Sequence, residues 1–141
     1  MAYYLTADGG TESLRARIYD LTGHCLGQMA VPYDTHFAPG ARAEQNPEDW
    51  WQALVTASAG AIAQAGIDGA QVEAMCLATT CCTVVALDEA GRALRPALLW
   101  MDVRANAEAD LIEALEVAVE MGGGPAVMYS GKALAAFRAL A

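Results

Sequence analysis

The sequence predicts a mixed α/β domain in which a three-stranded antiparallel meander is followed by a helix and further βα units. Two observations carry this prediction. Three short strand-like segments lie close together within residues 2–33, separated by turn residues. The helix start "NPEDWW" at 46–51 then precedes another apolar strand segment at 72–78. Because a helix of this length returns the chain before that strand, we expect it to run parallel to its neighbour.

The meander is expected as strands over 2–7, 13–20 and 25–33. In the second of these, apolar and polar residues alternate, which is the period of a strand with one solvated face. The turn "DLTG" between the second and third strands ends with Gly23, a residue that readily takes positive φ. Residues 34–45 are rich in Pro, Gly and polar side chains, and we expect a loop there.

The first helix is expected from Pro47 to Ala65, with Asn46 as its N-cap and Gly66 at its end. After it we expect strands over 72–78 and 83–87, a turn over 88–91, an extended piece over 96–100 and a second helix over 103–120. The pattern fades from Gly122. We therefore expect one domain over 1–121 and a divergent or truncated tail over 122–141.

Composition limits the classes of partner. The chain has 141 residues, 55% of them hydrophobic, which suits a single core. Its formal net charge of −9, with eight Lys and Arg in all, argues against a nucleic-acid surface. No apolar run approaches the roughly eighteen residues that span a bilayer, so we expect no membrane partner. Four cysteines without metal spacing fit reduced thiols in a cytoplasmic protein.

The segment "TADGGTESLR" at 6–15 carries the first candidate site, which we call the acid-glycine turn (residues 8–12). Gly9 and Gly10 allow close backbone approach, while Thr11 and Ser13 offer hydroxyls and N–H groups to an anion. Asp8 suits a magnesium ion bound through water. A simple hairpin turn explains the same residues, and spacing alone leaves both interpretations open. The predicted topology brings this turn and "TTCC" at 79–82 to one edge of the sheet, where open α/β sheets bind ligands.

Three motifs in order resemble the FGGY family of carbohydrate kinases, part of the actin and hexokinase superfamily. They are "DGGTESLRARIYDLTG" at 8–23, "GARAEQNPEDWW" at 40–51 and "LATTCCTVVALDEAGRALRPALLWMDVRA" at 77–105. The resemblance covers about residues 3–107 and is closest to the pentulose kinases of the ribulokinase type. It implies a ribonuclease H-like, actin-like ATPase half-domain, which agrees with the meander and βα order read from the residues.

The resemblance also implies roles for particular residues. Asp8 would position Mg²⁺, and the β- and γ-phosphates of ATP would meet Gly9, Gly10, Thr11 and Ser13. Arg15 would steady the transferred phosphoryl group, although a solvated strand arginine explains it equally well. The sugar would meet Thr79, Thr80, Cys81, Asp102 and Arg104. For Asp102 and Arg104, a helix-start cap and a surface ion pair are the alternative interpretation.

The chain departs from the family after the last of these motifs. The family's catalytic base and its second, nucleotide-binding domain lie beyond the region that this sequence matches. The resemblance therefore implies the N-terminal portion of a pentulose kinase, inactive alone, that associates with a missing C-terminal half or with itself through exposed apolar surface. The alternatives are a non-catalytic actin-like module that binds nucleotide, sugar or a partner chain, and a homodimer in which two copies rebuild a cleft.

Overall fold

The computed structural model describes residues 2–110, and the chain divides into two compact units. Unit 1 takes Met1–Thr35 and Gln45–Cys81, and unit 2 takes His36–Glu44 and the chain from Cys82 onward. Within residues 2–110, no helix is long and apolar enough to cross a bilayer.

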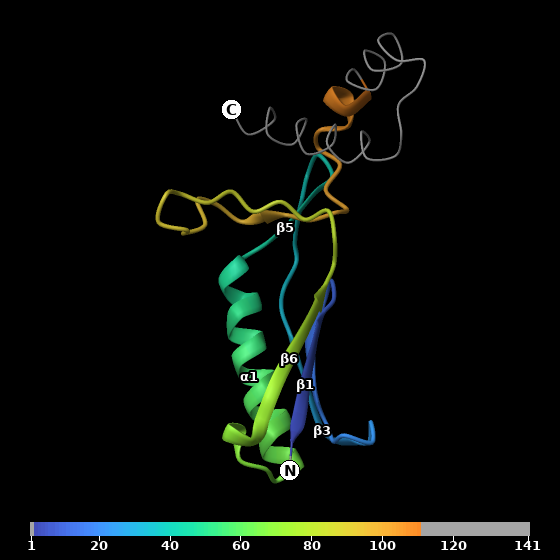
Figure 1. Cartoon of the computed structure of the whole chain (residues 1–141). Helices are drawn as coiled ribbons and strands as arrows, with labels where there is room; N and C mark the ends of the chain where they lie inside the picture. Colours follow the sequence, from blue (N-terminus) through green and yellow to red (C-terminus); the bar gives the residue numbers. More distant parts are fainter. Residues whose placement is uncertain (1, 111–141) are drawn as a thin grey trace, which may run out of the picture. The chain divides into compact units, whose positions relative to one another are not determined.

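Unit 1 is built on a four-stranded sheet with the strand order β3-β2-β1-β6 (Figure 1). Its strands are β1 (Tyr3–Gly9), β2 (Ser13–Tyr19), β3 (Cys25–Pro32) and β6 (Val72–Thr79). The first three strands pair antiparallel, and β6 pairs parallel with β1. This confirms the predicted meander and the predicted parallel strand. The turn between β2 and β3 is confirmed as well, with Gly23 at φ +81°.

The helix α1 (Pro47–Ala65) begins and ends at the residues that the sequence predicts. The side-chain oxygen of Asn46 accepts a hydrogen bond from the Glu48 N–H at 3.2 Å, which satisfies one of the free donors of the first turn. Gly66 takes the left-handed conformation at φ +66° and ends the helix. The short 3₁₀ helix η1 (Gly69–Gln71) then leads into β6.

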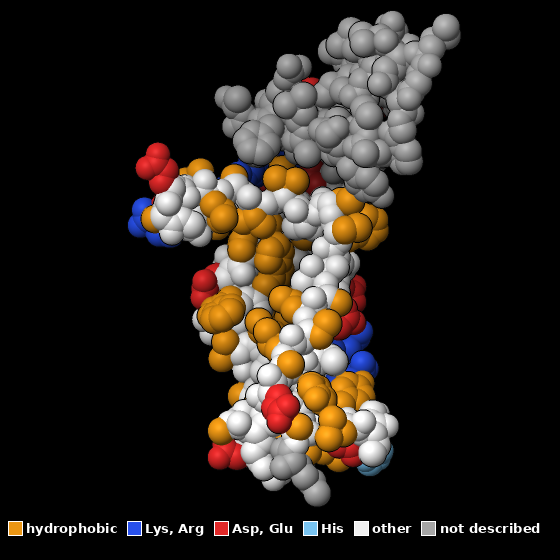
Figure 2. All heavy atoms as spheres, in the orientation of Figure 1, with side chains coloured by type: hydrophobic (Ala, Val, Ile, Leu, Met, Phe, Trp, Pro, Cys, Tyr) orange, Lys and Arg blue, Asp and Glu red, His pale blue; other side chains and the backbone are white. Residues whose placement is uncertain are grey.

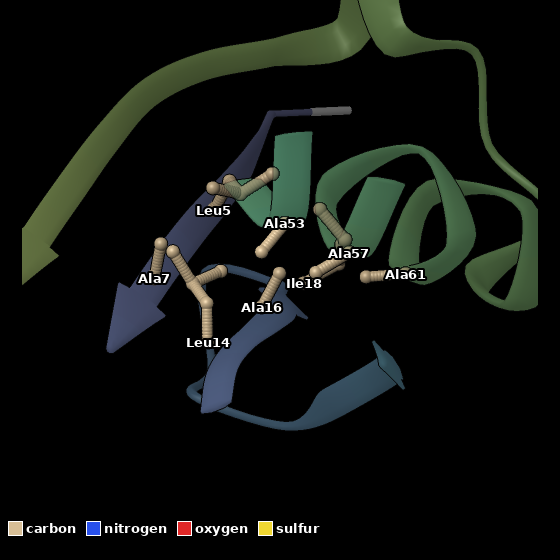
Figure 3. Close-up of a cluster of buried hydrophobic side chains, with 8 residues drawn as sticks. All are labelled: Leu5, Ala7, Leu14, Ala16, Ile18, Ala53, Ala57 and Ala61. Atoms are coloured by element: carbon tan, nitrogen blue, oxygen red, sulfur yellow. The ribbon is translucent and has the colours of Figure 1, made fainter. Parts of the chain in front are cut away.

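The core of unit 1 lies where α1 packs on the sheet. The helix presents Ala53, Ala57 and Ala61, which are spaced by four residues and are at most 2% exposed. Figure 3 shows these alanines pointing toward side chains of β1 and β2, namely Leu5, Ala7, Leu14, Ala16 and Ile18. The helix α1 also lies very close to β3 at Gly27. A Cβ added at Gly27 would lie 2.3 Å from the Ala61 carbonyl oxygen, so only a glycine fits there. Small residues on both elements therefore set the helix-to-sheet distance.

The strand β6 is an edge of this sheet, and most of its side chains are exposed. It pairs with β1 on one side, and no strand within residues 2–110 pairs with its other side. Met75 is 55% exposed and Leu77 is 48% exposed. Figure 2 shows hydrophobic side chains along β6 and on α1 on this face of unit 1. An unpaired backbone edge with apolar side chains is typical of a surface that receives another strand.

Unit 2 contains strands of a second sheet, with the order β4-β5-β7. They are β4 (His36–Ala38), β5 (Arg42–Gln45) and β7 (Ala97–Leu98). β4 and β5 form an antiparallel hairpin within 34–45, so the predicted loop was wrong over most of that range. Strands of three and four residues are too short to show a period in the sequence, and turn residues dominate the composition around them.

In the rest of unit 2, the strand pairing is shorter than the sequence predicts. No strand forms over 83–87: Val84 pairs with Leu98 and Leu87 pairs with Ala93, each as an isolated bridge, on either side of the predicted turn. The predicted extended piece at 96–100 is confirmed as β7. The backbone is helical over 106–110, within the predicted second helix. The rest of that helix and the tail over 122–141 lie outside the described residues.

Candidate functional site

The acid-glycine turn joins β1 to β2 in unit 1. Asp8 and Gly9 are the last two residues of β1, so only residues 10–12 lie between the strands. The Gly10 N–H donates to the Ser13 carbonyl at 3.0 Å and closes the turn. Asp8 lies directly opposite Arg15 in the antiparallel register, and both are exposed. A carboxylate and a guanidinium therefore stand as cross-strand neighbours on one face of the sheet beside the turn.

Donors from outside the hairpin hold the carbonyl groups of this turn. The Tyr33 hydroxyl donates to the Gly10 carbonyl, and the Tyr33 N–H donates to the Glu12 carbonyl at 3.1 Å. The Thr11 carbonyl lies between these two and accepts from the Gln45 side-chain amide at 2.7 Å. Three consecutive carbonyl groups are therefore fixed by two residues that lie well apart from the turn in sequence.

Neither of these two residues belongs to a motif that the sequence indicates as a site. Tyr33 lies 23 positions from its hydroxyl's acceptor, and Gln45 lies 34 positions from Thr11, so no local pattern indicates either contact. Burial raises the pKa of the Tyr33 hydroxyl, and the charge of Asp8 raises it further. The hydroxyl therefore stays protonated at neutral pH and remains a donor to the turn.

The Thr-Thr-Cys segment meets the acid-glycine turn within unit 1. The parallel register pairs Thr79, the last residue of β6, with Gly9, the last residue of β1. The Thr80 N–H donates to the Gly9 carbonyl at 3.1 Å. A Cβ at Gly9 would lie 3.3 Å from the Thr79 methyl carbon, so the glycine permits this close approach. Thr79, Thr80 and Cys81 are all exposed, and the predicted meeting of the two segments at one edge of the sheet is confirmed.

Asp102 and Arg104 lie in unit 2, where they form an ion cluster with Glu44 and Arg95. Arg104 Nη2 is 2.6 Å from Asp102 Oδ2 and 2.7 Å from Glu44 Oε1, and Arg95 pairs with the same Glu44 oxygen. Asp102 also accepts from the Ala43 N–H at 2.8 Å, which ties the cluster to β5. The Asp102 and Arg104 side chains are 4% and 12% exposed. The ion pair of the alternative interpretation is therefore present, although its side chains are largely buried rather than at the surface, and Asp102 also accepts from the Arg104 N–H at 3.2 Å.

The charges of the ion cluster support one another. Burial disfavours the ionised form of Glu44, but hydrogen bonds and charges from Arg104 and Arg95 outweigh it, and the pKa of Glu44 is lowered. Burial also opposes the charge of Asp102, but hydrogen bonds from Arg104 and the Ala43 N–H lower its pKa. The hydrogen bond to Asp102 raises the pKa of Arg104. All three groups are therefore charged at neutral pH.

The predicted site residues fall into two groups, one in each unit. Those in unit 1 are Asp8, Gly9, Gly10, Thr11, Ser13, Arg15, Thr79, Thr80 and Cys81. Those in unit 2 are Asp102 and Arg104. Within residues 2–110, no three His, Cys, Asp or Glu side chains gather into a metal-binding group. A cation beside Asp8 would therefore find fewer than three such side chains among the residues that the structure describes.

Comparison with known proteins places the chain in a family. The model for the FGGY family of carbohydrate kinases, N-terminal domain, matches residues 3–123. The chain belongs to this family. A glycerol kinase from Citrifermentans bemidjiense is 31% identical to it over 117 residues, which cover 82% of this chain and 23% of the relative.

Solved structures agree on the fold of this FGGY chain. A xyloylose kinase from Brucella ovis matches with a TM-score of 0.76 and 28% identity, over 82% of this chain and 24% of that one. Glycerol kinase from Plasmodium falciparum, solved with ADP, shares the fold with a TM-score of 0.65 and 18% identity, over 81% and 23% of the two chains. The predicted actin-like ATPase fold is therefore confirmed. This FGGY chain spans less than a quarter of the length of these relatives.

Proposed function

We propose that this chain is the N-terminal part of an ATP-dependent kinase that transfers the γ-phosphoryl group to a pentulose or a related polyol. The observation that carries the proposal is the pairing of Gly9 with Thr79, which brings the acid-glycine turn and the Thr-Thr-Cys segment together in unit 1. Open α/β sheets bind their ligands at the carboxyl ends of parallel strands. Membership of a carbohydrate kinase family supports phosphoryl transfer as the reaction.

The acid-glycine turn is assigned to the nucleotide. The residues proposed to face the phosphates of ATP are Gly9, Gly10, Thr11 and Ser13. Arg15 is proposed to steady the transferred phosphoryl group, supported by its place opposite Asp8. One carboxylate suits Mg²⁺, which keeps most of its water and takes its remaining ligands from phosphate, so Asp8 is proposed to hold a water of that ion. The ADP in the Plasmodium falciparum glycerol kinase supports a nucleotide as the ligand.

The Thr-Thr-Cys segment is assigned to the sugar. Exposed hydroxyls at Thr79 and Thr80, with Cys81 beside them, suit a polyol that needs both donors and acceptors. Asp102 and Arg104 are proposed as further sugar residues, held in fixed, charged form by the ion cluster. The xyloylose kinase supports a pentulose, whereas the glycerol kinases support a smaller polyol. The ribulokinase type stays a prediction, and so does the cytoplasmic location.

Turnover is proposed to need the rest of the kinase. Phosphoryl transfer depends on groups placed on both sides of the nucleotide, and this chain spans less than a quarter of its relatives. We therefore expect no sugar phosphorylation from this polypeptide alone. The edge of β6, which no strand within residues 2–110 pairs and which exposes Met75 and Leu77, supports docking of the remaining part of the kinase or of a second copy of this chain.

Calorimetric titration tests the assignment of the ligands. We expect the chain to bind Mg·ATP saturably, and to bind one polyol among D-xylulose, D-ribulose, L-ribulose and glycerol, without turnover. Asp8→Asn should weaken Mg·ATP binding about tenfold, because it removes a charge-assisted contact. The control is Asp34→Asn, an equal change of charge at an exposed residue of unit 1 outside the proposed site.

The outcomes separate the two candidate functions. Binding of Mg·ATP and of a polyol supports the kinase half-site. Nucleotide binding without any polyol favours the non-catalytic actin-like module instead. If no ligand binds, or if Asp34→Asn weakens Mg·ATP as much as Asp8→Asn does, the assignment of the acid-glycine turn is contradicted.

A further inference from the structure

Among polar and charged residues within 2–110, Gln45 is the one that is buried as a whole residue, at 2% exposure. Burial of an amide is favourable only when its polar atoms find partners. Its Nε2 donates to the Thr11 carbonyl at 2.7 Å and to Thr35 Oγ1 at 2.6 Å. Its Oε1 accepts from Trp50 Nε1 at 2.9 Å. The side chain therefore joins the acid-glycine turn to the first turns of α1 within unit 1.

The chemistry of the partners fixes which way the Gln45 amide points. An indole N–H only donates, so Trp50 must face the amide oxygen. A backbone carbonyl only accepts, so Thr11 must face the amide nitrogen. Reversing the amide would set oxygen against oxygen and nitrogen against nitrogen at these two contacts. Trp50 therefore holds Gln45 in the one orientation in which it donates to the turn.

Fixing the carbonyl groups of the turn also fixes its N–H groups. A trans peptide is planar, and its C=O and N–H point in opposite directions. The carbonyl of Thr11 is held by Gln45, and those of Gly10 and Glu12 are held by Tyr33. The N–H groups that follow these carbonyls, on residues 11–13, are consequently directed away from Gln45 and Tyr33.

This arrangement matters for an anion. Carbonyl oxygens that turned toward a phosphate would repel it, whereas ordered N–H groups attract it. Mobile peptides in a glycine-rich turn would have to be ordered when the ligand binds, and that ordering would weaken the affinity. A buried amide that holds the middle carbonyl in place lessens both effects.

We propose that Gln45, oriented by Trp50, is a positioning residue that holds the Thr11 peptide so that the acid-glycine turn presents its N–H groups to a phosphate. The inference rests on the proposed function for its ligand, but its structural part does not need the ligand. Gln45 touches the turn and not the nucleotide. Its removal should therefore loosen the turn even in the ligand-free protein.

The experiment uses the full chain, labelled with ¹⁵N, and compares Gln45→Met with the wild type by NMR. Methionine keeps the length of the side chain and removes both hydrogen-bonding groups. We expect the ¹⁵N order parameters of Thr11 and Glu12 to fall from about 0.85 toward about 0.6, while those of core residues such as Ala16 and Ile18 stay unchanged. Mg·ATP binding, measured by calorimetry on the same samples, should weaken about tenfold.

The matched control is Gln52→Met, the same substitution at an exposed glutamine of α1 that contacts Glu48 and not the turn. It should leave both the turn amides and Mg·ATP affinity unchanged. A second variant, Trp50→Phe, keeps one aromatic ring and removes the N–H donor that orients Gln45. It should loosen the turn in the same direction by a smaller factor, and it decides the question if Gln45→Met does not fold.

The two proposals fail in different ways. If the wild type binds no Mg·ATP but Gln45→Met and Trp50→Phe still loosen the turn, the positioning role stands and the proposed ligand is wrong. If Thr11 and Glu12 keep their ¹⁵N order parameters in the folded variants, the positioning role is overturned, whatever the wild type binds. Equal loosening by Gln52→Met would overturn it as well.

Discussion

The acid-glycine turn of unit 1 and the ion cluster of unit 2 both carry candidate site residues, but different forces hold them. Neutral groups fix the turn: the Tyr33 hydroxyl and the Gln45 amide donate to its carbonyls. Charges fix the ion cluster, in which Glu44 receives two arginines and Asp102 pairs with one of them. An anionic support beside a site for an anion would repel the ligand, whereas the neutral hydroxyl and amide do not.

The ion cluster has the opposite requirement. Its carboxylates and guanidiniums satisfy one another, so charged groups stay ordered with little net charge between them. Each removed partner leaves an opposite charge with too few contacts in a largely buried position. We therefore expect unit 2 to respond to the loss of charge, and unit 1 to respond to changes in packing.

The largest effect is expected from Gly27→Ala, which tests the packing beneath the turn. The added methyl would lie 2.3 Å from the Ala61 carbonyl oxygen and 2.6 Å from the Ala65 nitrogen, so α1 must move away from β3. We expect a loss of about 3 kcal/mol in the free energy of unfolding, measured by urea denaturation. Gly69→Ala is the control, since its nearest contact would be 3.8 Å away, and a comparable loss there would contradict the packing argument.

The second-largest loss of stability is expected from Arg104→Met, which removes a cation from the ion cluster. Methionine keeps much of the length of the side chain but leaves Asp102 and Glu44 without their shared partner. We expect a loss of about 2 kcal/mol, less than for a fully buried pair because Glu44 stays partly exposed. Hydrogen exchange should rise first in unit 2.

Arg92→Met provides the control in the same unit. Arg92 pairs with Asp88 while its side chain is 81% exposed, so we expect Arg92→Met to lower the free energy of unfolding much less than Arg104→Met does. A similar loss from the two variants would mean that burial of the ion cluster adds nothing to its strength.

A smaller loss in the free energy of unfolding is expected at acid pH. The folded-state pKa values of Glu44 and Asp102 are lowered below their unfolded values, which are about 4. Their contribution to stability is therefore complete above about pH 5 and is lost as the pH falls through the folded-state values. Protonated carboxyls still form hydrogen bonds, so we expect a smaller loss than for Arg104→Met.

The acid-glycine turn should depend on pH in the opposite sense: it should keep its supports in acid and lose one of them in alkali. The pKa of Tyr33 is raised, so its hydroxyl donates at all pH values below about 10 and fails only in alkali. NMR spectra recorded from neutral pH down to about pH 3.5 should show loss of order first at residues of the ion cluster, while the backbone of residues 10–12 keeps its ¹⁵N order parameters. The variant Glu44→Gln/Asp102→Asn serves as the control, and an unaltered acid profile in it would contradict the assignment to these carboxyls.

The elements that the sequence predicts correctly are those with local signals. Asn46 and Gly66 mark the two ends of α1 through contacts within a few residues, and both ends are found where predicted. Alternation over seven residues likewise identifies β2. The β4–β5 hairpin was missed, because its strands of three and four residues carry no period of their own.

The supports of the candidate site depend on distant contacts and were missed for that reason. Gln45 lies immediately before the helix cap, and a local interpretation assigns it to a loop. Its partner Thr11 is 34 positions away. Arg104 was a candidate through the resemblance. Its contact with Glu44 spans 60 positions, so neither the segment around Arg104 nor that around Glu44 predicts the contact. Local patterns therefore indicate candidate residues, while the contacts that support them depend on the tertiary fold.

The smallest effect is expected from Asn46→Ala, at the point where local and distant contacts join. Loss of the cap leaves a free N–H at the start of α1 and should cost about 1 kcal/mol in the free energy of unfolding. Asn46→Ser restores an acceptor and should recover most of that loss. Trp50 lies close to this end of α1 and orients Gln45, so fraying of the helix should also lower the ¹⁵N order parameter of Thr11. If stability falls while Thr11 keeps its order parameter, the Gln45 contact holds the turn without help from the helix cap, and the support of the turn is more local than its contacts indicate.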